Sequence, residues 1–351
     1  MLTDGVALTD HHCHGVVAAD LDRPGFERLL GEGQRGTFDS SIGLAVRRWC
    51  APVLDLEPHA DPAEYLTRRA ELGWREVSTR LLRAAGTTRW FLDSGFGGGT
   101  SEFAALADGE VREIVRLEQI AEQVIAENGT TTLPFEEIEA ALRERARNAV
   151  GLKTIVAYRC GLDFPLRNTP PATAPQSRLT DPDILGWLIG LAVRIGVENG
   201  LPLQFHTGFG DTDLRLHRAD PLLLTDFLRT TAGSGLSIML LHCWPFQRNA
   251  AYLAHAFEHV RLDLGLTIPY VGQRSTAVLA ETLELAPFNS MLYSSDGYGL
   301  PELHYLGALL WRRGLGRLLD EWIGEDVITL ADAERLVIAI AHRNAASIYP
   351  E

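Results

Sequence analysis

Short apolar runs alternate with amphipathic helical stretches along most of the chain. Apolar residues at every second position indicate strands, and a spacing near 3.6 indicates helices. The predicted strands are residues 6–14, 89–93, 113–117, 152–158, 203–206, 236–242, 260–264 and 291–296. The predicted helices are residues 118–149, 184–198, 221–230, 249–259, 275–285, 302–322 and 331–349. Strands that alternate with helices pair in parallel, so eight such units predict an α/β fold, a closed (β/α)8 TIM barrel, with an open doubly wound sheet as the alternative.

Two stretches near the first strands do not follow this rhythm. Residues 21–85 show no strand-like alternation, and Asp61-Pro62 is a helix start with an N-cap and an early proline, which predicts a helical insertion. The glycine-rich stretch 94–99 lacks the GxxxxGK[ST] and GxGxxG spacings of phosphate-binding loops, which favours a flexible loop. We therefore predict that residues 1–351 form one barrel domain, with 21–85 as an insertion and extra helices at the C-terminus.

Composition limits the classes of partner. The 351 residues are 46% hydrophobic and 22% charged, which is typical of a globular protein with a sizeable core. A net charge of −14 argues against nucleic acid or an anionic membrane as the main partner, and favours a small-molecule substrate. Four scattered cysteines without CxxC spacing, and no signal-peptide or membrane-spanning run, predict a soluble cytoplasmic protein. The two long closing helices are compatible with a homo-oligomer.

Polar residues stand at or near the ends of the predicted strands, and they are His12, His14, Lys153, His206, His242 and Asp296. His12 and His14 share one face, because side chains alternate along a strand. In a barrel the C-terminal ends of all strands meet at one mouth, where active sites of this fold lie. Alone, each residue would more often be a core histidine or a turn aspartate. Together they form the nitrogen and oxygen donor set of a divalent metal site, which predicts zinc, with manganese or iron also compatible, as one or two ions.

This order of residues resembles the amidohydrolase superfamily over essentially the whole chain. The segments GLK at 151–153, AYRCGL at 157–162, LQFHTG at 203–208 and YSSD at 293–296 look like its amidohydrolase-2 branch, which includes the amidohydrolase-like half of FluG-type proteins. The resemblance implies that the metal ligands are His12, His14, His206 and Asp296. It makes His242 either a catalytic histidine beside them or a ligand of a second ion. Lys153 would be carboxylated and bridge two ions, or would be a buried ion-paired lysine, and both readings stay open.

The chemistry implied is hydrolysis by metal-activated water. A divalent ion lowers the pKa of bound water towards ~7. Asp296 would take a proton from that water and pass it to the leaving group. His242 would polarise the substrate carbonyl or stabilise the developing oxyanion.

Three residues near the same strand ends are candidates for substrate binding. Arg159 could form a bidentate pair with a substrate carboxylate, although an ion pair with a loop acid accounts for it nearly as well. Tyr158 precedes it, and Gln204 shares a strand face with His206. Together with this set, the resemblance to FluG-type proteins implies a small anionic amide, such as a γ-glutamyl or acyl-amino-acid compound, as the substrate.

Three functions are compatible with the sequence. The first is a metal-dependent amidohydrolase that cleaves a C–N bond of a small, carboxylated molecule. The second is a non-oxidative decarboxylase, because similar barrels in the same branch release carbon dioxide; a single ion and an uncarboxylated Lys153 would favour it. The third is a non-catalytic binding protein, which predicts the loss of one or more ligands, whereas every expected position is filled.

Overall fold

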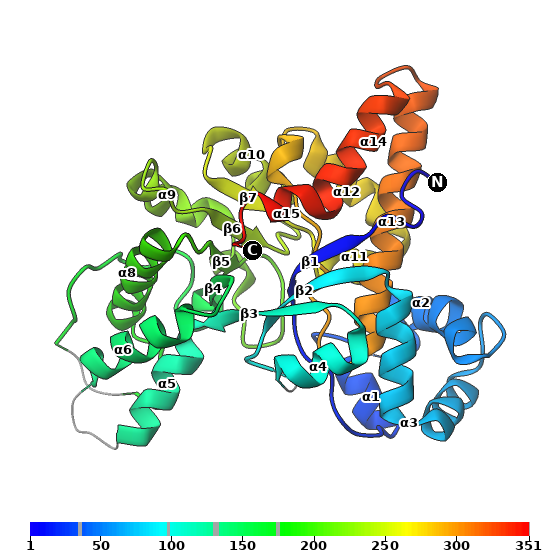
Figure 1. The fold of residues 1–351 in the computed structure, drawn as a ribbon, viewed down its shortest axis with the longest axis horizontal. Coiled ribbons are helices and arrows are strands. Elements are labelled where there is room, and N and C mark those ends of the chain that lie inside the picture. Colours follow the sequence, from blue (N-terminus) through cyan, green and yellow to red (C-terminus); the bar gives the residue numbers. More distant parts are fainter. Residues whose placement is uncertain (34–36, 97–98, 129–132, 173–175, 351) are drawn as a thin grey trace. The chain divides into compact units, whose positions relative to one another are not determined.

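The computed structural model describes residues 1–350 apart from 34–36, 97–98, 129–132 and 173–175. Two residues of the predicted glycine-rich loop, 97 and 98, therefore lie outside the described residues. The chain divides into two compact units, Met1–Arg112 with Asp263–Ala345, and Glu113–Leu262 with Ala346–Glu351. Each contains parallel strands and helices (Figure 1).

The first unit carries two regular strands, β1 (Leu8–Cys13) and β2 (Thr87–Asp93), which pair in parallel with Asp10 opposite Trp90. Its helices are α1 (Arg23–Leu29), α2 (Ser41–Ala45), η1 (Val46–Cys50), η2 (Ala51–Leu54), α3 (Pro62–Ala84), α4 (Thr100–Ala107), α11 (Thr267–Val271), η5 (Gly272–Arg274), α12 (Ser275–Leu283), η6 (Phe288–Ser290), α13 (Pro301–Gly324), α14 (Leu330–Ile338), η7 (Ala339–Arg343) and α15 (Asn344–Ala346), the last ending at the unit boundary.

Helices α1, α2 and α3 occupy the stretch for which an insertion is predicted. Asp61 begins α3, since its carboxylate accepts a hydrogen bond from the Ala63 amide at 2.8 Å. The buried guanidinium of Arg69 on α3 lies 2.7 Å from the buried carboxylate of Glu302 on α13, and Tyr65 donates to the same carboxylate at 2.8 Å. A buried pair needs such additional hydrogen bonds, so this network fixes α3 against α13.

The second unit carries β4 (Gly151–Thr154), β5 (Leu203–His206), β6 (Ile238–Leu241) and β7 (Val260–Leu262), and most of β3 (Glu110–Arg116), which begins before its boundary. Neighbours pair in parallel, and Lys153 on β4 lies opposite Arg116 on β3 and Gln204 on β5. Its helices are α5 (Leu117–Asn128), α6 (Phe135–Ala146), α7 (Val156–Arg159), α8 (Pro182–Asn199), η3 (Leu216–Arg218), η4 (Pro221–Leu224), α9 (Thr225–Thr231) and α10 (Gln247–Ala256).

The described residues form seven regular strands rather than the predicted eight: β1 pairs with β2 in the first unit, and β3 to β7 pair in chain order in the second. The predicted eighth strand, 291–296, runs beside β1 without a regular ladder. Its backbone bonds join the His11 amide to the Tyr293 carbonyl at 3.2 Å and the Asp296 amide to the His12 carbonyl at 3.1 Å. Between them, the Ser295 amide donates to the Asp10 side chain at 3.0 Å, so a carboxylate takes the place of a ladder partner.

The predicted fourth strand, 152–158, is also wrong in its second half. β4 ends at Thr154, and α7 follows as a single helical turn. The buried carboxylate of Glu118 accepts the Ile155 amide at 3.0 Å, and the Thr154 hydroxyl accepts the Val156 amide at 3.1 Å, so side chains satisfy donors that a longer strand would pair. Lys153 therefore lies one residue from the strand end, the position that a ligand at the mouth requires.

The predicted last helix, 331–349, is broken into α14, a π-helical turn and a short final turn. None of the described helices has the length and apolarity needed to span a bilayer.

Candidate metal centre

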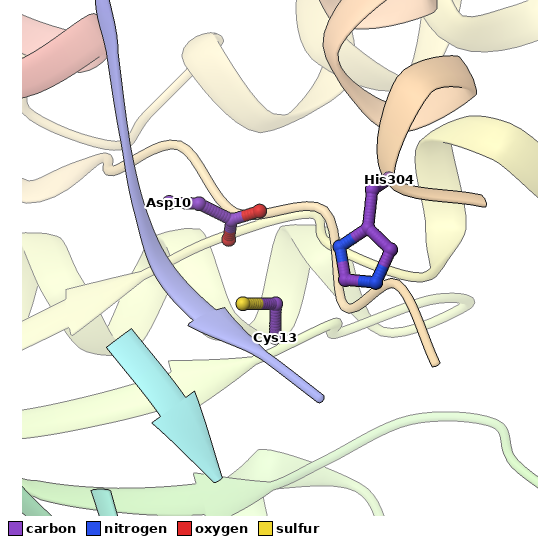
Figure 2. Close-up of side chains that lie close together, drawn as sticks. All are labelled: Asp10, Cys13 and His304. Atoms are coloured by element: carbon purple, nitrogen blue, oxygen red, sulfur yellow. The ribbon is translucent and has the colours of Figure 1, made fainter. Parts of the chain in front are cut away.

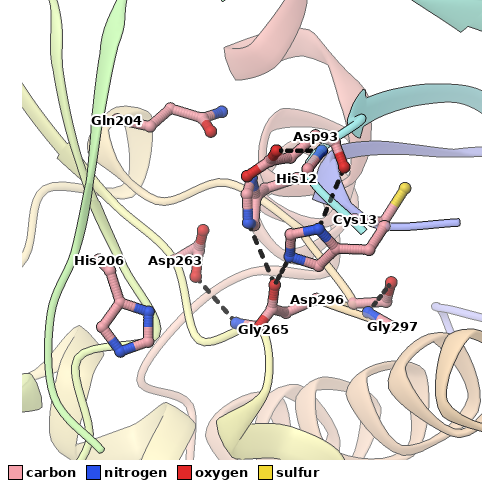
Figure 3. Close-up of polar contacts among 12 residues, drawn as sticks. His12, Cys13, Asp93, Gln204, His206, Asp263, Gly265, Asp296 and Gly297 are labelled. Carbon is pink, nitrogen blue, oxygen red and sulfur yellow. Dashed lines mark hydrogen bonds and ion pairs between the residues drawn. The ribbon is translucent and has the colours of Figure 1, made fainter. Parts of the chain in front are cut away.

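Three of the predicted metal ligands converge in the first unit. The Nε2 atoms of His12 and His14 lie 3.1 and 3.3 Å from the same oxygen, Oδ1 of Asp296. Both histidines come from the end of β1 or just beyond it, and Asp296 comes from the segment hydrogen-bonded to β1. All three side chains are buried. Figure 3 shows the contact between His12 and Asp296 as a dashed line.

The two distances from these nitrogens to the Asp296 oxygen are compatible with ligands of one metal ion. A tetrahedral zinc site with bonds of about 2.0–2.1 Å holds neighbouring donor atoms about 3.3 Å apart. The two contacts, 3.1 and 3.3 Å, are close to that edge length. Asp296 has a left-handed backbone with φ 49°, a conformation unusual for a residue other than glycine and found preferentially at functional sites. The donor set present in this unit therefore suits a divalent ion.

Outer contacts hold two of these ligands in place. The Nδ1 atom of His14 lies 3.2 Å from the Asp93 carbonyl, so its N–H donates there and Nε2 keeps the lone pair that faces Asp296. The Asp93 carboxylate in turn accepts the Gly95 amide at 3.0 Å. Asp10 fixes the residue before Asp296, because its two oxygens accept the amide and the hydroxyl of Ser295.

Sequence reasoning missed Asp263. Its Oδ2 lies 2.9 Å from Nε2 of His11, both side chains are fully buried, and its Oδ1 accepts the Gly265 amide at 2.9 Å. Figure 3 shows this bond to Gly265. Asp263 directly follows β7, so the pattern that identified Asp296, a carboxylate at the end of an apolar run, also applies to Asp263.

A second buried group in the same unit consists of Asp10, Cys13 and His304, hereafter the cysteine cluster (Figure 2). Each offers one donor atom, and these atoms lie within 4.8 Å of one another. Burial raises the pKa of Asp10 to about 8 and lowers that of His304 to about 3. Burial, followed by the carboxylates of Asp10, Asp296 and Asp93, raises the pKa of Cys13, so its thiol keeps its proton.

The second unit brings together His206, His242 and Tyr158. The rings of His206 and His242 have centroids 4.6 Å apart, and Tyr158 lies 4.6 Å from His206 on the same measure. His206 ends β5, with Nε2 3.1 Å from the Phe209 carbonyl. His242 follows β6 and has a left-handed backbone with φ 69°.

Three other predicted site residues have defined surroundings in this unit. Lys153 is buried, and it is the one lysine in a chain whose other basic side chains, histidines aside, are all arginines. Gln204 donates to the Tyr349 hydroxyl at 2.8 Å. Arg159 pairs with Glu122 at 3.0 Å, which is the ion pair considered as the alternative to substrate binding.

A family model described as amidohydrolase matches residues 55–350 of the chain. Among curated proteins, protein fluG of Emericella nidulans is 28% identical over 221 residues, which cover 57% of this chain and 25% of that protein. The chain thus spans about a quarter of the length of that relative.

Solved structures with similar folds include a "putative metal-dependent hydrolase" from Lactobacillus casei, with a TM-score of 0.86 and 25% identity over 99% of this chain and 96% of that one. Uronate isomerases from Bacillus halodurans and Thermotoga maritima give TM-scores of 0.66 and 0.63 at 12% and 14% identity. Each comparison covers 99% of this chain, and 94% and 96% of theirs. The isomerases show a likeness of fold alone.

Proposed function

The chain belongs to the amidohydrolase family, and from this premise we propose that it is a metal-dependent hydrolase that cleaves a C–N bond of a small, carboxylated molecule. The observation that carries the proposal is the convergence of two imidazole nitrogens on one carboxylate oxygen, at the spacing of metal ligands. The proposed ion is zinc, with manganese and iron as alternatives.

The rest of the ligand set is proposed from the sequence and the family. By the family pattern His206 would be a further ligand, His242 would act on the substrate or bind a second ion, and the scaffold would be a (β/α)8 barrel. Lys153, if carboxylated, would hold the ions of a binuclear centre, and otherwise it would be a buried ion-paired lysine. The support for carboxylation is chemical: a primary amine can react with carbon dioxide to form a carbamate, and the chain has a lysine at this one position, buried on β4.

Each side chain has a defined task in this proposal. A bound divalent ion supplies Lewis acidity, which acidifies water and polarises a carbonyl oxygen. The Asp296 carboxylate accepts the proton of the attacking water and later donates it to the leaving nitrogen. His242 donates a hydrogen bond to the substrate carbonyl oxygen as negative charge develops there. The Asp93 carbonyl keeps the proton of His14 on Nδ1.

The test measures metal per chain and carbamate together. Protein purified without added metal, and the volume-matched variant Lys153→Met, are assayed for metal and then equilibrated with ¹³C-bicarbonate for ¹³C NMR. Two ions, falling to one or none in the variant, with a carbamate signal that the variant lacks, support the binuclear hydrolase. N-acyl and γ-glutamyl amides are then screened for hydrolysis.

Other outcomes point elsewhere. One ion in both proteins and no carbamate would make Lys153 structural and would favour the decarboxylase, which is checked by release of carbon dioxide from small carboxylic acids. Absence of metal in both proteins, even after addition of zinc or manganese, would contradict both enzymatic functions.

A further inference from the structure

The second unit contains a cavity of about 280 Å³ whose lining is rich in arginine. Four arginines line it, Arg159, Arg178, Arg215 and Arg218, and we refer to it as the arginine pocket. Among the described lining residues Asp213 is the single acid. Such a concentration of guanidinium groups in a chain of net charge −14 indicates a site for an anion.

Ion pairs balance most of this charge. They join Arg159 to Glu122, Arg178 to Asp213 and Arg218 to Asp163, at 3.0, 2.8 and 2.5 Å. Arg215 has no carboxylate partner in the part of the chain that the structure describes. Arg215 is thus the one guanidinium of the four without an ion-pair partner among the described residues, and a ligand with a single carboxylate would supply that partner.

Contacts with neighbouring residues hold two of these arginines, Arg159 and Arg218, in defined positions. The Arg159 side chain is 9% exposed, and its buried Nε–H has no hydrogen-bond acceptor among the described residues. A buried donor of this kind needs an acceptor, which a ligand oxygen would supply. Gly161 has φ 98°, and a Cβ there would lie 2.6 Å from Nε of Arg218, so only glycine lets that guanidinium approach.

The arginine pocket adjoins a predicted site residue of the same unit. Tyr158 lines the pocket, and its ring lies 4.6 Å from that of His206. The pocket also contains Cys160, but burial raises the pKa of this thiol to about 12, so it is not a thiolate at neutral pH. The pocket therefore suits binding rather than covalent chemistry.

We propose that the arginine pocket binds the carboxylate of the substrate, so that the substrate is a small amide with one carboxylate away from the bond that is cleaved. Arg215 and the free Nε–H of Arg159 are the donors to that carboxylate. This inference rests on the proposed function for the identity of the reacting bond, but the anion site itself is a property of the second unit alone.

Direct binding tests the inference without any turnover. The probes are N-acetylglycine and its neutral counterpart N-acetylglycinamide, and binding is followed by saturation-transfer NMR on metal-stripped protein. We expect the acid to bind and the amide not to bind. Arg215→Ala should weaken binding of the acid about 10- to 100-fold, the effect of losing a hydrogen bond to a charged group. Arg215→Glu should abolish it.

The matched control is Arg229→Ala, which removes an exposed arginine that pairs with Asp226 and does not line the pocket. Circular dichroism confirms that each variant is folded. Equal binding of acid and amide, no binding of the acid, or unchanged binding by a folded Arg215→Ala protein would overturn the inference. If inorganic phosphate bound more tightly than N-acetylglycine and Arg215→Ala lost this binding, the ligand of the pocket would be a phosphate and the carboxylate proposal would be wrong.

The two proposals fail separately. Absence of metal or of amide hydrolysis would contradict the proposed function and leave the binding result intact. Hydrolysis of neutral and carboxylated amides at equal KM, with metal bound, would contradict only the role of the arginine pocket.

Discussion

Two groups of potential metal donors in the first unit include residues of β1. They differ in the contacts and hydrogen bonds that their donor atoms already make. In the first group, His12 and His14 present nitrogens to one oxygen of Asp296. In the cysteine cluster, the Asp10 carboxylate already accepts two hydrogen bonds from Ser295, and the Cys13 thiol lies 3.7 Å from the Phe91 carbonyl. Proximity alone therefore does not distinguish a metal site from a buried polar cluster.

The distinguishing feature is the protonation that each environment favours. A metal ion requires unprotonated donors, and His14 achieves this by giving its proton at Nδ1 to the Asp93 carbonyl. In the cysteine cluster, burial raises the pKa values of Cys13 and Asp10, so both acids tend to keep their protons. We infer that the first group binds metal and that the cysteine cluster supports the backbone around it.

Asp296→Asn should have the largest effect. The amide cannot accept a proton from water, and it replaces the anionic donor that both imidazoles face, so we expect loss of bound metal and a fall in kcat/KM of at least ~10²-fold. Metal analysis and steady-state kinetics measure this. The control is Asp226→Asn, an aspartate almost fully exposed to solvent, which should keep both properties. If Asp296→Asn kept its full metal content, the metal would have to be bound by other residues.

Asp10→Asn makes the same chemical change in the cysteine cluster. The new amide oxygen can still accept the Ser295 N–H, but the amide nitrogen cannot accept the proton of the Ser295 hydroxyl, so that buried hydrogen bond is lost. We expect a loss of about 1–3 kcal/mol in the free energy of unfolding, with metal content unchanged. Urea unfolding of metal-free protein, beside metal analysis of purified protein, separates the two effects. Loss of metal without loss of stability would contradict the comparison.

His304→Leu tests the same cluster through pH. Burial lowers the pKa of this imidazole from 6.5 to about 3, so the unfolded chain binds a proton that the folded chain does not, and stability falls as the pH drops below 6.5. At pH 5, which is about 1.5 units below the pKa of the unfolded chain, the free energy of unfolding of the natural protein should have fallen by roughly 2 kcal/mol. The variant should not show this loss. Unfolding of metal-stripped protein at pH 7.5 and pH 5 measures the difference. His255→Gln, at an exposed position, should behave like the natural protein.

The prediction of the fold was accurate where residues that favour turns mark both ends of a strand or helix. The strand 203–206 was predicted with the bounds of β5, because an apolar run lies between Pro202 and Thr207-Gly208. The fourth strand was predicted too long, since residues 155–158 are apolar or aromatic and suit a strand or a helix equally well. What ends β4 is the Glu118 carboxylate, 36 residues earlier in the chain, and periodicity carries no trace of such a contact.

The same limit applies to the site. The spacing of His12 and His14 and the position of Asp296 after an apolar run brought these residues to attention, and the structure brings the three together. The arginine pocket was not predicted, because Arg218 reaches it through a tertiary contact in which its carbonyl accepts the Leu162 amide at 2.9 Å. Only Arg159 had a signal in the sequence, its position after the fourth strand.

Cys13→Ala should have the smallest effect. The side chain is fully buried, so its truncation costs about 1 kcal/mol of stability through lost packing. Because its neighbours favour the protonated thiol, the variant should bind as many zinc ions per chain as the natural protein. Titration of metal-free protein with cadmium is the sharper measurement, since this ion prefers thiolate ligands. The comparison would be wrong if Cys13→Ala bound one cadmium ion fewer than the natural protein while His14→Gln kept that ion. The cysteine cluster would then bind metal on its own, and protonation would not separate the two groups.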